Sequence, residues 1–147
     1  MILPITLSAA GAAAIINIWL AMRCGQTRTK EKISMGDGGN EALISRMRAH
    51  ANFVEYTPFF LILLALIEMA KGSSTWLWVV SGLFIVGRLA HAFGMDGWKP
   101  GRPVGTIITM LSLLGLGGYA IAIPHLAASE ISTPADSEGS VEAVPEG

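Results

Sequence analysis

Four long apolar stretches separated by short polar segments dominate the pattern of this chain. The first covers residues 3–22, in which Asn17 is the only strongly polar side chain. The pattern predicts three further helices, over residues 41–71, 75–95 and about 103–123. About 20 mainly apolar residues in a helix cross the ~30 Å hydrocarbon layer of a membrane. The sequence therefore predicts an all-α integral membrane protein built as a four-helix bundle.

A cleaved signal peptide is the alternative interpretation of the first stretch. Such a peptide carries basic residues before its apolar run and a small residue before the cleavage point. No Lys or Arg precedes Arg23 here. A retained first helix is therefore the favoured interpretation.

The segments between the apolar stretches predict the order of the bundle. Residues 24–40 form a polar loop, and Asn40 is a candidate N-cap for the second helix. Residues 72–74 form a short turn, so the second and third helices should be antiparallel neighbours. Residues 96–103 form a compact polar connection to the fourth helix. We expect residues 1–126 to form one transmembrane domain and residues 127–147, which are acidic and lack Lys and Arg, to form a disordered tail.

Composition supports the membrane assignment independently. Hydrophobic residues make up 52% of the chain and charged residues 14%, compared with about 25% charged residues in soluble domains. Mean hydropathy is +0.53. The single cysteine, Cys24, excludes a disulfide within the chain. With a formal net charge of -1, nothing indicates a nucleic-acid partner.

The distribution of cations predicts the orientation in the membrane, since Lys and Arg are enriched in cytoplasmic loops. The second connection and both termini hold only Lys71. We therefore expect both termini on the non-cytoplasmic side and the first and third connections in the cytoplasm. Those two connections hold the remaining loop cations: Arg23, Arg28, Lys30, Lys32, Lys99 and Arg102.

A polar stripe at the start of the second helix carries the candidate chemistry. At about 100° per residue, Arg48, Asn52, Glu55 and Tyr56 share one face, whereas His50 lies on the opposite face. Ionisable groups inside a spanning segment usually face a bundle interior or a water-filled cavity, and they indicate a functional site by default. The same half of the bundle is expected to hold Arg88 and His91 from the third helix, and Arg102.

We expect an ion pair between Glu55 and Arg88, because each would otherwise be a lone charge inside the membrane, and this pair would hold the second and third helices in register. Two interpretations of Arg48 and Arg102 remain open. In the first, they bind a ligand with carboxylates or a thiolate. Alternatively, both arginines extend toward lipid phosphates. His50 is expected to pack or to lie at the interface rather than to bind metal. No metal site is predicted, and the helical faces disfavour His50 and His91 as a haem-ligating pair.

The segment from Arg48 to Pro58 resembles the second-helix motif of the MAPEG family, the membrane-associated proteins of eicosanoid and glutathione metabolism. Its matching residues are Arg48, Ala49, Asn52, Glu55, Tyr56 and Pro58. Arg88 and Arg102 also resemble a spacing found in the leukotriene-forming glutathione transferases of that family. The resemblance covers residues 2–126.

The resemblance implies a homotrimer of four-helix subunits that binds glutathione in a cleft between subunits, near the cytoplasmic side. It implies that Arg102 activates the glutathione thiol. Glutathione would be the co-substrate, and lipophilic electrophiles would arrive from the membrane lipids. The implied glutathione-binding residues are Arg48, His50, Asn52, Glu55, Tyr56, Arg88 and His91.

Three departures from the family pattern narrow the expected activity. His91 and Met95 stand where the leukotriene-forming members have tyrosines. Pro103 and Ala51 stand where the prostaglandin-forming members have serine and arginine. These changes disfavour both eicosanoid activities and favour a broad membrane glutathione transferase, with a possible peroxidase activity. A non-catalytic trimeric scaffold or lipid-binding module of the same fold is the alternative. A proton-coupled exporter is disfavoured because the first helix lacks a carboxylate.

Overall fold

The computed structural model describes residues 2–131, and these residues form four helices in sequence order. They are α1 (Pro4–Glu31), α2 (Glu41–Lys71), α3 (Thr75–Met95) and α4 (Gly101–Ile131). All four are long and apolar enough to cross a membrane. The predicted all-α membrane bundle is therefore confirmed for the described part of the chain.

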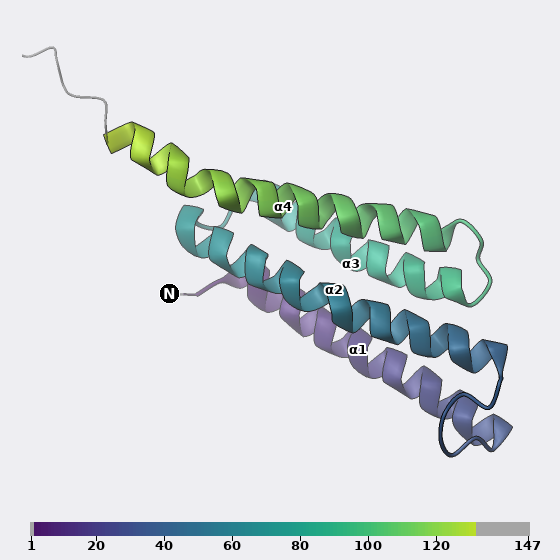
Figure 1. Ribbon diagram of the computed structural model, residues 1–147. Coiled ribbons are helices and arrows are strands. Elements are labelled where there is room, and N and C mark those ends of the chain that lie inside the picture. Colours follow the sequence, from purple (N-terminus) through teal and green to yellow (C-terminus); the bar gives the residue numbers. More distant parts are fainter. Residues whose placement is uncertain (1, 132–147) are drawn as a thin grey trace, which may run out of the picture.

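The helices run antiparallel to their neighbours in sequence, so each end of the bundle has its own connections (Figure 1). The loop end holds residues 32–40 and the connection between α3 and α4, and the terminal end holds the N-terminus and the turn between α2 and α3 (Figure 1). Helices α2 and α3 each contact every other helix, whereas α1 and α4 do not contact each other. The core consequently lies along α2 and α3.

Two helices have the predicted bounds, and two extend beyond them. Helices α2 and α3 have the predicted bounds, and the Asn40 side chain accepts a hydrogen bond from the Leu43 N–H at 2.9 Å, as an N-cap does. Helix α1 continues nine residues past Met22 to Glu31. Polarity at residue 23 thus marks the limit of the apolar segment and not the end of the helix.

Helix α4 also extends past its predicted end near Ile123 and includes residues 127–131. The first five residues of the segment expected to be a disordered tail are therefore helical. This is a correction to the prediction, because an acidic composition alone does not stop a helix that is already formed. The rest of that segment, residues 132–147, lies outside the described residues.

Glu68 closes the terminal end of the bundle. Its carboxylate is almost fully buried and accepts hydrogen bonds from the Ile5 N–H at 3.1 Å, the Thr6 N–H at 2.9 Å and the Thr6 hydroxyl at 2.8 Å. The Ser73 hydroxyl donates a fourth bond at 2.7 Å. Because the first N–H groups of a helix lack partners within the helix, Glu68 of α2 caps α1 from a distance of more than sixty residues in sequence.

Candidate functional site: a polar cavity between α2, α3 and α4

A polar cavity of about 220 Å³ lies between α2, α3 and α4 in the loop-end half of the bundle. Five of the residues selected from the sequence meet there although they come from three helices. Ala51 and Met95 complete its walls. The five selected residues are Arg48, Asn52, Glu55, His91 and Arg102.

Helical spacing explains the contribution of α2. Arg48, Asn52 and Glu55 are separated by four and three residues, which places them on one face of a helix. His50 lies off this face, and its Nε2 is 2.8 Å from the Asn17 Oδ1 of α1. Tyr56 is half-buried and is not among the residues that line the cavity. The geometry therefore separates His50 and Tyr56 from the five residues that meet.

Arg88 lies behind the cavity wall and is 2% exposed. Its guanidinium donates to the Asn52 Oδ1 at 2.7 Å and to the Thr109 Oγ1 at 3.2 Å. The predicted ion pair with Glu55 is absent from the described ion pairs, and Glu55 is exposed. That prediction was wrong because α4 passes close enough to α3 for the Thr109 hydroxyl to accept a hydrogen bond from the Arg88 Nη1, while the Asn52 oxygen accepts one from Nη2.

Glycines in α3 and α4 allow this close approach. A Cβ on Gly87 would lie 2.8 Å from the Ile108 Cγ2, and a Cβ on Gly105 would lie 2.7 Å from the His91 Cβ and closer still to the Gly87 carbonyl oxygen. Both distances are shorter than a side chain tolerates, so the two backbones pack against each other only without side chains at these points. This contact brings His91 and Arg102 to the same cavity.

A second polar cluster at the loop end joins three helices, and the sequence pattern did not single it out. Arg23 of α1 and Arg46 of α2 both pair with Asp96, which follows α3; the Arg46 Nε lies 3.5 Å from Asp96 Oδ1. Arg46 also donates to the Thr27 hydroxyl at 2.7 Å and to the Arg23 carbonyl at 3.2 Å. Arg23 was expected in a loop. The three-to-four spacing of the buried residues Ile16, Leu20, Arg23 and Thr27 is the signal that continues α1 through it.

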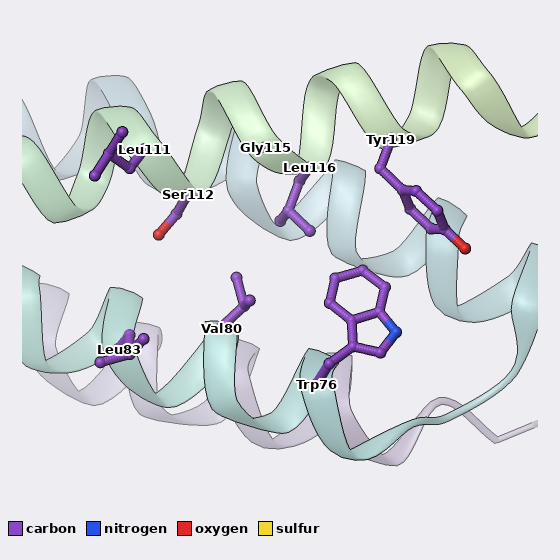
Figure 2. Close-up of a pocket in the computed structure, with 8 residues that line it drawn as sticks. All are labelled: Trp76, Val80, Leu83, Leu111, Ser112, Gly115, Leu116 and Tyr119. Carbon is purple, nitrogen blue, oxygen red and sulfur yellow. The ribbon is translucent and has the colours of Figure 1, made fainter.

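An apolar cavity of about 550 Å³ lies between α3 and α4, nearer the terminal end than the polar cavity. Figure 2 shows Trp76, Val80 and Leu83 on one side, facing residues of α4 on the other. The Trp76 and Tyr119 rings meet edge to face at one end, with centroids 5.3 Å apart. The lining from α4 consists of Leu111, Ser112, Gly115, Leu116 and Tyr119.

Comparison with known proteins identifies the family to which this bundle belongs. The model of the MAPEG family matches residues 6–122, which is most of the chain and covers the whole of the polar cavity. The chain belongs to the MAPEG family. The resemblance in the second helix is thereby confirmed.

Two curated matches are known by the name inner membrane protein YecN, one from Escherichia coli strain K12 and one from Escherichia coli O6:H1 strain CFT073. Each is 38% identical to this chain over 68 residues, which is 46% of this chain and 51% of the relative. The chain thus spans about half the length of the curated relatives it matches. These names describe location and state no activity.

Proposed function

We propose that this MAPEG protein is a membrane glutathione transferase that acts on lipophilic electrophiles. The observation that carries the proposal is the convergence of Arg48, Asn52, Glu55 and Arg102 on one polar cavity. Glutathione has two carboxylates, one ammonium group and a thiol. The Arg48 guanidinium suits a carboxylate, the Arg102 guanidinium suits the thiolate, and the Glu55 carboxylate suits the ammonium, so the charges of the cavity complement those of the peptide.

Arg102 is the residue we assign to the thiol. A thiol is a weak nucleophile until it is ionised, and an adjacent cation favours the thiolate. The thiolate sulfur forms a bond to the electrophilic carbon of an aryl halide, and the halide leaves with the electron pair of the broken bond. With a lipid hydroperoxide, two glutathione molecules would give the disulfide, the alcohol and water.

The exposure of the charged residues supports a homotrimer in which a second copy closes the site. Arg48, Glu55 and Arg102 are exposed in the single chain, although a carboxylate facing lipid within a spanning segment is costly. The volume of about 220 Å³ is also below the ~300–1,000 Å³ typical of ligand pockets. A partner subunit would supply the missing wall.

The proposal also includes the orientation in the membrane. The two matched relatives are named inner membrane proteins, and the loop end carries most of the cations outside the apolar segments. By the positive-inside tendency, the loop end and the polar cavity face the cytoplasm and both termini face the other side.

The direct test is turnover of glutathione and an activated aryl halide by the purified protein, together with calorimetric binding of glutathione. We expect Arg102→Ala to lower kcat by about 10²–10³-fold, as removal of one anion-stabilising donor does. Lys99→Ala, three residues earlier and exposed, is the matched control and should retain activity. Wild-type protein that neither binds glutathione nor turns over would exclude the enzymatic function.

A non-catalytic trimeric scaffold or lipid-binding module is the second candidate, and the apolar cavity between α3 and α4 favours it (Figure 2). Its volume of about 550 Å³ exceeds that of the polar cavity. This function predicts a co-purified lipid in native mass spectra from mild detergent. It also predicts that Arg102→Ala has no effect on any measured property.

A further inference from the structure

The orientation of the Asn52 amide follows from its contact with Arg88. The Arg88 Nη2 lies 2.7 Å from the Asn52 Oδ1. A guanidinium has five N–H donors and no acceptor, so only the carbonyl oxygen of the amide can face it. The Asn52 Nδ2 must therefore point away from Arg88.

Arg88 cannot easily release the amide, because its other contacts hold it in place. Its Nη1 donates to the Thr109 Oγ1 at 3.2 Å, and the Thr109 hydroxyl donates in turn to the Gly105 carbonyl at 2.8 Å. Arg88 and Thr109 are both fully buried, and the guanidinium lies 5.7 Å from the centroid of the Phe53 ring. A flipped Asn52 amide would set its NH₂ group against a buried cation and leave a guanidinium donor without an acceptor, which is strongly unfavourable.

The consequence reaches the cavity, because Asn52 is part of its lining while Arg88 is not. With its oxygen facing Arg88, the Asn52 amide leaves its two N–H donors for a ligand. Arg48 and Arg102, which also line the cavity, likewise carry donors only. The Asn52 amide and the two arginines thus accommodate a hydrogen-bond acceptor, whereas the Glu55 carboxylate, which also lines the cavity, accommodates a donor such as the ammonium group.

We propose that Arg88 is a positioning residue that fixes the Asn52 amide, so that Asn52 selects a carboxylate of the bound peptide. This inference rests on the proposed function and deepens it by naming the group of the ligand that this residue recognises. Arg88 does not touch the ligand; it acts through the orientation of Asn52.

The test changes Asn52 and Arg88 in turn, and the first variant replaces the N–H donor of Asn52 with an acceptor. Asn52→Asp keeps an oxygen for Arg88 but presents an acceptor to the cavity. The probes are glutathione and its two mono-amides, one amidated at the glycine carboxylate and one at the α-carboxylate of the γ-glutamyl residue. Wild type should bind glutathione at least about tenfold more tightly than one of the mono-amides, because a donor site rejects an amide NH₂. Asn52→Asp should reverse that preference, while its thermal unfolding temperature in detergent stays at or above that of wild type.

Variants of Arg88 separate positioning from packing. Arg88→Gln can still donate an N–H to the Asn52 oxygen, whereas Arg88→Met fills similar space without a donor. We expect Arg88→Gln to retain the preference for glutathione over the mono-amide and Arg88→Met to lose it. If Asn52→Asp keeps the wild-type preference, or Arg88→Met does so while remaining folded, the inference is overturned and the proposed function stands. Wild type that binds none of the three probes overturns the proposed function, and this inference with it.

Discussion

Glu68 shows how much of this bundle depends on single polar residues placed inside it. The carboxylate accepts four hydrogen bonds, two of them from backbone N–H groups at the start of α1. A negative charge at a helix N-terminus is stabilising, because it satisfies unpaired N–H groups and opposes the helix dipole. Its burial strengthens these bonds, since water does not compete for them.

Replacing Glu68 with Ala should therefore destabilise the terminal end of the bundle. We expect a loss of about 2–4 kcal/mol in the free energy of unfolding, from the unpaired N–H groups and the lost charge-assisted bonds. Thermal or denaturant unfolding in detergent measures it. Glu41→Ala is the control because Glu41 is an exposed carboxylate on the same helix, and its loss should cost less than about 1 kcal/mol. Equal effects of the two variants would contradict this role for Glu68.

At the scale of the helix pair, the glycines of α3 and α4 determine where His91 and Arg102 lie. Gly87 and Gly105 sit at the crossing of the two helices, where a Cβ would overlap the other helix. Arg88 can reach Thr109 because of this approach. Gly87 and Gly105 therefore determine both how closely the two helices pack and which side chains line the polar cavity.

Gly105→Ala should force α3 and α4 apart. The added methyl group meets the Gly87 carbonyl and the His91 Cβ, and overpacking of this kind typically costs about 1–3 kcal/mol. Glutathione binding should weaken together with stability. In Gly118→Ala, by contrast, the methyl group meets nothing within 4 Å, and the better helix propensity of Ala should leave stability unchanged or slightly higher. Tolerance of Ala at position 105 would show that the helices do not cross as described.

The ion pairs of Asp96 with Arg23 and Arg46 connect helices at the loop end. They link α1 and α2 to the segment that leads into α4. Asp96→Ala leaves Arg23 buried without a carboxylate, and we expect a loss of about 2–3 kcal/mol, below the full cost of breaking a buried pair because Asp96 is partly exposed. Glu31→Ala removes the exposed pair with Lys30 and should cost at most about 1 kcal/mol. Unfolding measurements on both variants compare the two pairs directly, and an Asp96 variant as stable as wild type would exclude the structural role.

At the scale of the whole molecule, the two ends of the bundle differ in charge. The exposed cations Lys30, in the last turn of α1, and Lys32, directly after it, lie at the loop end, whereas Lys71 lies at the terminal end. In the proposed homotrimer, a second copy would cover Arg48, Glu55 and Arg102, which are exposed in the single chain.

Labelling of single cysteines in intact cells tests the orientation. In a Cys24→Ala background, we expect Ser73→Cys to react with a membrane-impermeant maleimide from outside. Met35→Cys, in the highly exposed loop between α1 and α2, should react only after the membrane is disrupted. The opposite pattern would invert the predicted topology. Native mass spectra of the same preparations should give three copies per particle.

The sequence by itself determined the class of this protein, the bounds of α2 and α3, and the face of α2 that carries Arg48, Asn52 and Glu55. These features follow from local rules: an apolar run of sufficient length must cross the membrane as a helix, and the period of 3.6 residues decides which side chains share a face. The helix extensions beyond the apolar runs were missed because hydrophobicity marks the limit of the membrane and not the last helical residue.

Only the tertiary structure decided the partners of the charged groups. Arg88 binds Asn52 and Thr109 in place of Glu55, Asp96 joins Arg23 and Arg46, and Glu68 caps α1. Each of these contacts depends on the distance and rotation between helices, which glycine positions and side-chain packing determine together. A pattern along one helix carries no measure of how closely a second helix approaches it, so these partners emerge only when the bundle is assembled.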